Sequence, residues 1–324
     1  MKTRIEERVS AFTLWTPLWT ILACGIAVWK APLCSKTFGS LPVLQSSYWT
    51  LMMTMGLAIS KKDIENLQQT SPRILLWNAL LCFVGMPLLA VGLSSIGQLP
   101  SYHATGLIVL GCVGGGQASN LFALLAGGNV ALSVLCTIST TILGVLATPL
   151  LLDKLLGAAV GSSTSLGATL QSVLSLVLVP LLVGSTLSRS FPQLIQNISK
   201  FLPLLGIFAT LLLVIGGSSN SFLATTLSTT SVGSWSTILW PSCALGIFGG
   251  MAALGVAQIL KLEKSTKKIL VVETLSKSPT LAYLLSRKHF GIQSALIPGG
   301  AMVTLAVLGA LVASVWSKVD DITI

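Results

Sequence analysis

The sequence predicts an all-α polytopic membrane protein, and two observations carry that fold class: the composition and the recurrence of long apolar segments. Of the 324 residues, 53% are hydrophobic and only 9% are charged, whereas about a quarter of the residues in an ordinary soluble domain are charged. The mean hydropathy is +0.87. A soluble protein of this length needs far more charged surface than this composition supplies. Lipid is therefore expected to surround most of the folded chain.

Apolar segments of membrane-spanning length recur along the whole chain. A transmembrane helix needs about 20 mostly apolar residues. Segments of that length lie at 11–32, 43–60, 74–97, 166–188, 201–217, 235–260 and 293–317. Two further spans fall within 103–153, and an interrupted one falls within 269–286. We therefore expect about ten transmembrane helices, divided into two five-helix repeats at 1–160 and 161–324.

The distribution of lysine and arginine orients the predicted helices. With ten spans both termini share one side, and the loops of that side hold most of the 19 basic residues. The other side holds Lys30, Lys36, Lys154, Arg287 and Lys288. Because cytoplasmic loops carry the excess of basic residues, we expect both termini in the cytoplasm. The formal charge of +10 does not indicate nucleic-acid binding, since these cations are scattered among short loops rather than gathered on one face.

The fourth predicted span of each half is interrupted. Three glycines, 114–116, break the first, and Lys277, Ser278 and Pro279 break the second. In a helix, glycine costs about 1 kcal/mol and proline about 3 kcal/mol relative to alanine. Broken helices persist in membranes where they are buried in protein or line a cavity, and matched breaks indicate a transporter's binding site. Because each half has an odd number of spans, the two halves have opposite orientations in the membrane. Close helix packing is an alternative explanation for the glycines, but it does not explain the second break.

Glu273 is the one acidic residue expected at membrane depth, and Lys277 lies four residues after it. Each such charge costs at least about 2.5 to 3.5 kcal/mol on an insertion scale, so intramembrane charges usually mark functional sites. The alternative is a salt bridge between the two side chains that only fixes the local helix.

Amide and hydroxyl groups gather after the first break. Gln117, Ser119 and Asn120 lie at the break, and Ser133 and Thr137 lie four residues apart on one face of the next span. Together with one carboxylate, such hard oxygen donors suit an alkali cation such as Na+. Serine and threonine in membrane helices also commonly bond their own backbone, which is the alternative for this set.

Several of these residues form a recognisable signature. The stretch GGGQASN at 114–120, followed by AGGNVALSVLCTIST, resembles the signature of the bile acid:sodium symporter family. MGLAIS at 55–60, FVGMP at 83–87, and Glu273 with Leu281 and Ala282 agree with it further. The resemblance implies two inverted five-helix repeats that form a panel and a core domain, with broken helices four and nine crossing at the site. It also implies symport of an organic anion with Na+.

The resemblance assigns site residues as well. It implies a sodium site made of oxygen ligands from Ser119, Asn120, Ser133, Thr137 and Glu273. The anion would lie beside the ends of the broken helices. At the first break it would be bordered by the backbone near Gln117 and Ala118, and at the second by Ser278. No cofactor is expected beyond Na+ as the coupling ion.

The chain departs from the family pattern at a second sodium site. Two glutamines of the family are replaced here by Cys82 and Lys277. A lysine ammonium brings one positive charge and three hydrogen-bond donors, so we expect Lys277 to substitute for the second sodium. Gly114 replaces the family's proline, and Asn129 replaces its aspartate.

The sequence therefore predicts a sodium-coupled symporter of a small organic anion in the bilayer. One alternative is coupling to H+, if Lys277 loses its proton in one state, and another is transport of the anion without sodium. An ion channel or a non-transporting scaffold are alternatives of another class. An enzyme is not expected, because His103 and His289 lie far apart and no catalytic motif is present. The substrate, the oligomeric state, and the choice between a bacterial plasma membrane and a plastid envelope stay open.

Overall fold

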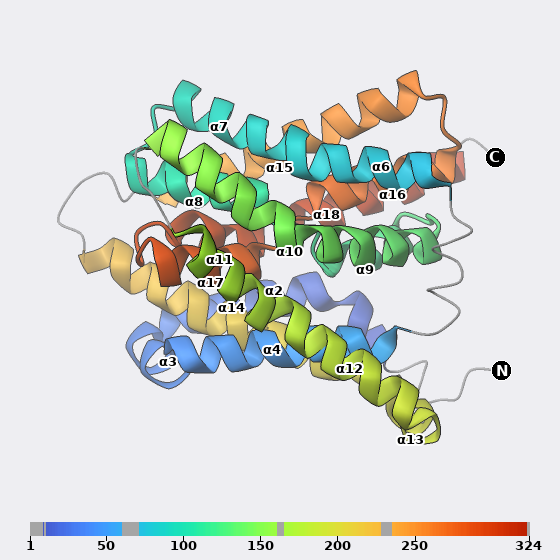
Figure 1. The fold of residues 1–324 in the computed structure, drawn as a ribbon, viewed down its shortest axis with the longest axis horizontal. Coiled ribbons are helices and arrows are strands. Elements are labelled where there is room, and N and C mark those ends of the chain that lie inside the picture. The colour runs from blue at the N-terminus through green and yellow to red at the C-terminus, as the bar shows by residue number, and fades with distance from the viewer. Residues whose placement is uncertain (1–8, 10, 60–70, 161–164, 228–234, 323–324) are drawn as a thin grey trace.

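The computed structural model describes residues 9, 11–59, 71–160, 165–227 and 235–322, and all elements in these ranges are helices (Figure 1). The first half contains α2 (Thr16–Trp29), α3 (Ala31–Phe38), α4 (Leu41–Ala58), α6 (Pro72–Leu80), the π-helix η1 (Leu81–Gly85), α7 (Met86–Ile96), α8 (Ser101–Cys112), α9 (Ala118–Leu125) and α10 (Val130–Val160). The second half contains α11 (Leu166–Val173), the π-helix η2 (Leu174–Leu178), α12 (Val179–Ser190), α13 (Pro192–Ile198), η3 (Ser199–Phe201), α14 (Leu202–Leu227), α15 (Trp235–Ile259), α16 (Lys264–Leu275), α17 (Pro279–His289) and α18 (Leu296–Ile322).

The helices confirm a multi-pass membrane protein. In the described ranges, six continuous helical segments are long and apolar enough to cross a bilayer, and the bent pair α2 and α3 makes a seventh. The predicted total of ten spans and the repeat boundary stay predictions. That boundary adjoins 161–164, which lie outside the described residues. So do both chain ends and the basic residues Lys2, Arg4, Arg8, Lys61 and Lys62, which supported the predicted orientation.

The first predicted span, 11–32, extends too far at its C-terminal end. Helix α2 stops at Trp29, and the chain turns by 108° into α3. Pro32 lies in the first turn of α3. A proline has no N–H, and its ring clashes with the carbonyl group four residues earlier, so α2 cannot continue through this position.

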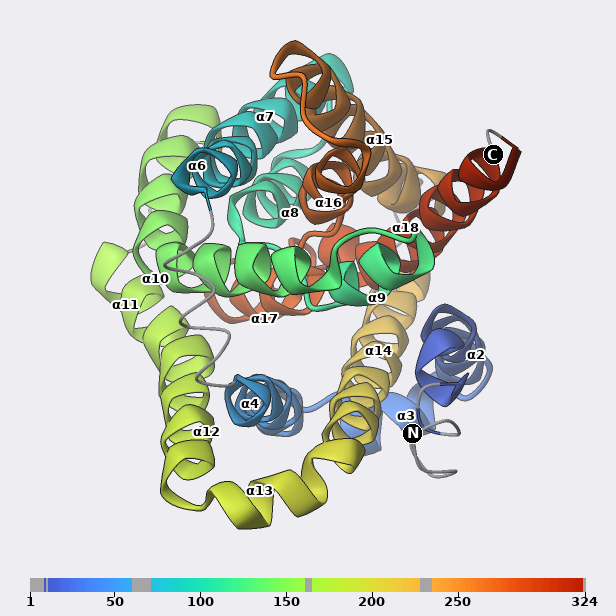
Figure 2. The ribbon, with the colours of Figure 1, turned by 90° about the vertical axis from the view of Figure 1, so that its right-hand side faces the viewer.

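The helices form two groups, which Figure 2 shows one above the other. In the first, called the α4 group here, α4 packs against α12 and α14, and α14 packs against α2 and α3; α11 leads into α12 through η2. The second, called the α10 group, contains α6 to α10 and α15 to α18, in which α8 packs against α7, α10 and α17. Both interrupted spans, α8 with α9 and α16 with α17, belong to the α10 group.

The contact between α4 and α12 depends on two glycines. A Cβ atom added at Gly56 would lie 2.3 Å from the carbonyl oxygen of Leu181, and one added at Gly184 would lie 2.3 Å from that of Met53. Small residues allow membrane helices to approach this closely. The α4 group is therefore held by backbone-to-backbone packing that a methyl group would prevent.

Replacing Gly56 by alanine is expected to destabilise the protein by about 1 to 3 kcal/mol, because the added methyl group forces α4 and α12 apart. Thermal unfolding of the purified variant in detergent measures the effect. Gly92→Ala in α7 is the matched control, since no atom lies within 4 Å of its added Cβ. Equal melting temperatures for Gly56→Ala and Gly92→Ala would contradict this packing.

Candidate functional site

The two helix breaks lie side by side at the centre of the α10 group. The N–H of Gly116 donates to the carbonyl oxygen of Ser276 at 2.7 Å, and the N–H of Ser278 donates to that of Gly114 at 3.2 Å. Within the part of the chain that the structure describes, the β-bridge between Gly115 and Lys277 is the one β-type pairing. Each break thus satisfies backbone groups that the other leaves without helical partners, as a membrane interior requires.

The glycine run is explained by this crossing. A Cβ atom at Gly116 would lie 2.4 Å from the carbonyl oxygen of Lys277, which is too close for any other residue. A Cβ atom at Gly115 would lie 3.3 Å from Oε2 of Glu273. The glycines therefore bring the first break against both charged residues of the second interrupted span.

Glu273 is buried among three hydroxyl groups. Ser133 Oγ donates to Oε1 of Glu273 at 2.5 Å, and Thr137 Oγ1 lies 3.1 to 3.2 Å from both carboxylate oxygens. The Ser119 Oγ atom lies 3.1 Å from Thr137 Oγ1 and donates to the carbonyl oxygen of Gly116 at 2.9 Å. All four side chains are at most 2% exposed. Among the described residues, no lysine, arginine or histidine forms an ion pair with Glu273.

Asn120, the fifth predicted ligand, follows Ser119 on α9. Its Oδ1 atom is buried and has no hydrogen-bond partner among the described residues. Buried acceptor oxygens are nearly always satisfied, so one without a donor calls for an explanation. A cation would provide it. The donor set of carboxylate, hydroxyl and amide oxygens fits Na+ and contains no soft ligand.

The Lys277 ammonium group bonds to Cys82 and not to Glu273, so the salt bridge considered as an alternative from the sequence does not form. Its Nζ atom donates to the carbonyl oxygen of Cys82 at 2.9 Å, contacts Cys82 Sγ at 3.0 Å, and lies 6.0 Å from the centre of the Phe83 ring. The Lys277 side chain is 2% exposed. The two buried charges of this segment therefore occupy separate environments.

The π-helix η1 makes the Cys82 carbonyl available to Lys277. In its wide turn the N–H of Met86 donates to the carbonyl oxygen of Leu81. The next residue, Pro87, has no N–H to continue this pattern to Cys82. Such π-turns are frequent at functional sites. Sequence reasoning read Cys82 as a lost sodium ligand and missed its backbone carbonyl, although the Pro87 of the FVGMP motif was the available signal.

Lys268, one of the basic residues counted in the predicted loops, is buried within the protein. It lies in α16, where its side chain is only 4% exposed and its Nζ donates to the carbonyl oxygen of Ala126 at 2.5 Å. Ala126 ends α9, and a cation is favoured at a helix C-terminus. Glu273 and Lys277 are therefore not the only buried charges.

Asn129, which stands where the family signature has an aspartate, caps the start of α10. Its Oδ1 accepts a hydrogen bond from the N–H of Leu132 at 3.1 Å, at the start of α10. Asparagine and aspartate cap helix N-termini about equally well. With asparagine at this position, the N-terminus of α10, the helix that carries Ser133 and Thr137, is still capped.

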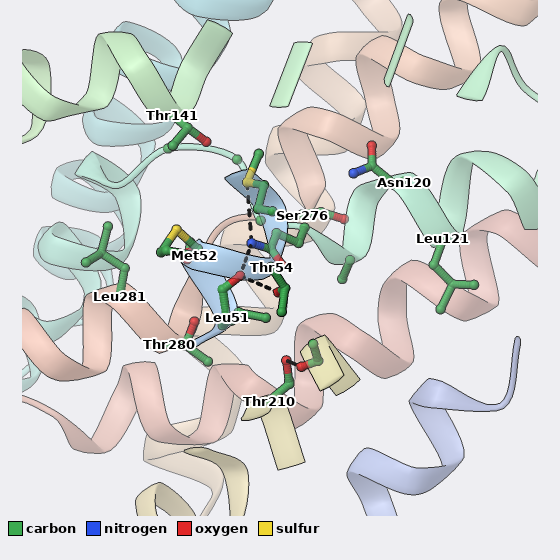
Figure 3. A pocket seen from close by; sticks show the side chains of 18 of the residues that line it. Leu51, Met52, Thr54, Asn120, Leu121, Thr141, Thr210, Ser276, Thr280 and Leu281 are labelled. Carbon is green, nitrogen blue, oxygen red and sulfur yellow. Dashed lines mark hydrogen bonds between the residues drawn. The ribbon is translucent and has the colours of Figure 1, made fainter. Parts of the chain in front are cut away.

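A cavity of about 720 Å³ lies between the two helix groups, directly beside the crossing. The predicted substrate residues Gln117, Ala118 and Ser278 line it, and so does Asn120, whereas the other four predicted sodium ligands lie behind the breaks. Figure 3 shows hydroxyl and apolar side chains around it, including Thr210 from α14, Thr280 from α17 and Met52 from α4.

Helix α4 contacts both breaks across the cavity, which sequence reasoning did not predict. Tyr48 lines the cavity together with Ser278, and α4 packs against α17, the helix that follows the second break. Gln117 Nε2 lies 3.5 Å from the carbonyl oxygen of Leu51. Both contacts join the α4 group to the α10 group. Nothing in the apolar run at 43–60 distinguishes Tyr48 from an interfacial or core aromatic residue.

An all-helical membrane protein with two broken helices meeting beside a central cavity has the features of a secondary transporter. The chain belongs to the Sodium Bile acid symporter family, whose model matches residues 49–222. It is 29% identical over 312 residues to the probable sodium/metabolite cotransporter BASS1 of Arabidopsis thaliana chloroplasts, covering 93% of this chain and 73% of that protein. It is 31% identical over 302 residues to YocS of Bacillus subtilis, described as an uncharacterized sodium-dependent transporter, covering 91% of this chain and 90% of that one.

The family and these relatives are transporters, so the chain is a membrane transporter and not an enzyme. Its relatives occur in chloroplasts and in a bacterium. These findings confirm the family resemblance drawn from the sequence.

Proposed function

We propose that this transporter carries a small organic anion together with Na+, and that Lys277 takes the place of a second sodium ion. One observation carries the proposal: the Glu273 carboxylate lies buried among hydroxyl groups without a basic partner. A buried charge is costly unless it is paired. A mobile cation that enters this site offsets that cost, and the relatives named as sodium cotransporters support Na+ in this role.

The coupling ion would be held by oxygen atoms from three elements. Its ligands would be Ser119 and Asn120 from α9, Ser133 and Thr137 from α10, and Glu273 from α16. A hydroxyl group that now donates to the carboxylate can turn and offer a lone pair to a cation. Because the ion joins the first break to the helix before the second, it stabilises the crossing that presents Gln117, Ala118 and Ser278 to the cavity. This shared geometry supplies a coupling free energy between ion and anion.

Lys277 would act as a cation that never leaves. Its ammonium group is fixed by the Cys82 carbonyl and thiol, and its charge lies at the breaks, where the N-termini of α9 and α17 also favour an anion. The transport cycle would then use one Na+. Coupling to H+ is the outcome to expect if Lys277 loses its proton during the cycle, and movement of the anion without sodium is a separate alternative.

The wider architecture is proposed on the same grounds. We place ten spans in two inverted repeats, 1–160 and 161–324, with both termini in the cytoplasm. In this arrangement the α10 group would be the core domain and the α4 group the panel domain. The two crossing breaks, one from each half, support it. The relatives support either a plastid envelope or a bacterial plasma membrane.

Sodium is expected to stabilise the purified protein, and Glu273→Gln is expected to remove that effect. At about ten times its dissociation constant a ligand adds about 1.4 kcal/mol of apparent stability. Thermal unfolding in NaCl is compared with unfolding in choline chloride at equal ionic strength. Asp153→Asn, which neutralises an exposed carboxylate of α10, is the matched control and should keep the sodium response. A sodium response that persists in Glu273→Gln would contradict the assigned ion site.

The stoichiometry is tested by titrating Na+ into the wild-type protein and following intrinsic tryptophan fluorescence. With Lys277 as the second cation, the Hill coefficient is expected to be about one. Replacing Lys277 by glutamine, together with Cys82→Gln, restores two oxygen donors and should raise it toward two. A coefficient near two in the unmodified protein would show that Lys277 does not stand for a sodium ion.

The substrate class is tested by a thermal-shift screen of small carboxylates and sulfonates with and without Na+. A compound that stabilises the protein more in Na+ is then labelled and used for counterflow in proteoliposomes. We expect uptake to accelerate when unlabelled compound is present on the opposite side. Flux without such acceleration would indicate a channel, and binding without flux would indicate a scaffold; either would contradict symport.

A further inference from the structure

Among the described residues, the lining of the cavity extends toward one end of the molecule. Its lining begins at Ser199, next to α13, and on each neighbouring helix it stops short of the opposite end (Figure 1). On α4 it covers residues from Tyr48 onward, on α14 it ends at Val214, and on α17 it ends at Leu281. The end of the molecule with α13 is called the α13 face here, and the opposite end, with α3, is called the α3 face. The cavity is closed toward the α3 face.

Buried side chains fill the space between the cavity and the α3 face. Leu44 of α4 and Tyr283 of α17 are both completely buried. Tyr283 also packs against α14, since a Cβ atom added at Gly217 would lie 3.7 Å from its ring. These side chains come from both helix groups. The closure toward the α3 face is therefore made where the two groups meet.

Beyond this apolar layer, the last turn of α17 is bonded to the connection between α3 and α4. Arg287 Nη1 donates to the carbonyl oxygen of Gly39 at 2.5 Å. The same carbonyl accepts from Asn220 Nδ2 of α14 at 2.9 Å, whose Oδ1 accepts from Ser35 Oγ of α3 at 2.6 Å. Asn220, Ser35 and Gly39 thus form a polar unit within the α4 group, and Arg287 fastens it to the α10 group.

The same turn of α17 is also bonded to α11. Lys288 Nζ donates to Ser172 Oγ at 2.8 Å, and His289 Nε2 lies 2.9 Å from the same oxygen. Ser172 is only 1% exposed. Three successive residues of α17, Arg287 to His289, therefore hold two separate parts of the α4 group at the α3 face.

We propose that Arg287, with Lys288 and Ser172, closes the transport path at the α3 face and that these bonds break and re-form in every cycle. A transporter must expose its site to each side in turn, so contacts that cross between the two helix groups can exist in only one of the two states. Here the acceptors are a backbone carbonyl and a hydroxyl group, not carboxylates. Such bonds are strong enough to bias the two states and weak enough to release. This inference concerns the gate and is independent of which ion drives transport.

The chemistry of the gate also suits an anionic solute. When the two helix groups separate, Arg287 and Lys288 lose their acceptors and remain as unpaired cations at the entrance. Cations at an entrance attract anions and raise their rate of association. The residues that close the path at the α3 face would therefore favour entry of an anion once it opens.

The gate is tested by asking from which side the cavity can be reached. Thr210 lines the cavity, and its hydroxyl group donates to the carbonyl oxygen of Gly206 in its own helix. Thr210→Cys therefore serves as a reporter in a chain whose six native cysteines are replaced by serine or alanine. The protein is reconstituted in vesicles of both orientations and treated with a membrane-impermeant maleimide. With the gate intact, labelling is expected from the α13 face.

Arg287→Ala is expected to raise labelling from the α3 face about ten-fold, because the closed state loses a charge-assisted hydrogen bond. Ser172→Ala removes the second acceptor with a minimal change in volume and should act in the same direction. The matched control is Lys36→Ala, which removes an exposed cation of α3 and should leave the labelling unchanged. The proposal fails if both gate variants, eluting as folded protein on gel filtration, label from the α3 face no faster than the parent. It also fails if Lys36→Ala has the same effect as Arg287→Ala.

Discussion

The crossing of two interrupted helices is the constraint on which the rest of the structure depends. A membrane offers no water to the backbone groups that a broken helix releases. Here the two breaks pair with each other through Gly116 and Ser276 and through Ser278 and Gly114. That pairing needs glycine at position 116. It also fixes where α9, α10 and α16 present their polar side chains. The position of the site therefore follows from the hydrogen bonds that satisfy the backbone groups at the two breaks.

The buried charges are separated from one another, and this separation gives the site its chemistry. Lys277 is held by a carbonyl group that a π-turn and Pro87 leave free, and Lys268 is held by the C-terminal carbonyl of α9. Glu273 alone receives only neutral donors. Pairing Glu273 with Lys277 would have satisfied both residues and left no place for a mobile ion. Keeping them apart leaves a carboxylate that, among the described residues, is bonded only to hydroxyl groups, and the proposed cation site rests on this arrangement.

The sequence predicts much of this arrangement because its signals are local. Apolar length predicts the helices, glycine and proline predict the breaks, and the four-residue spacing predicts that Ser133 and Thr137 share a helix face. The turn at Pro32, the carbonyl of Cys82 and the burial of Lys268 depend on contacts between distant segments, which spacing along the chain does not encode. The same holds for Arg287, whose acceptor at Gly39 lies 248 residues away in sequence. Charge counting could assign Arg287 only to a side of the membrane.

The central claim is that Glu273 and its neighbouring oxygens bind the coupling cation. A high-resolution structure of the protein in saturating Na+, repeated with Tl+ as an anomalous scatterer, tests it most directly. We predict one cation peak in contact with Glu273, Asn120 and the hydroxyl groups of Ser133 and Thr137, with the ammonium of Lys277 still on Cys82. The claim would be contradicted if, under these conditions, the cation were bound elsewhere and the Glu273 carboxylate were bonded only to hydroxyl groups.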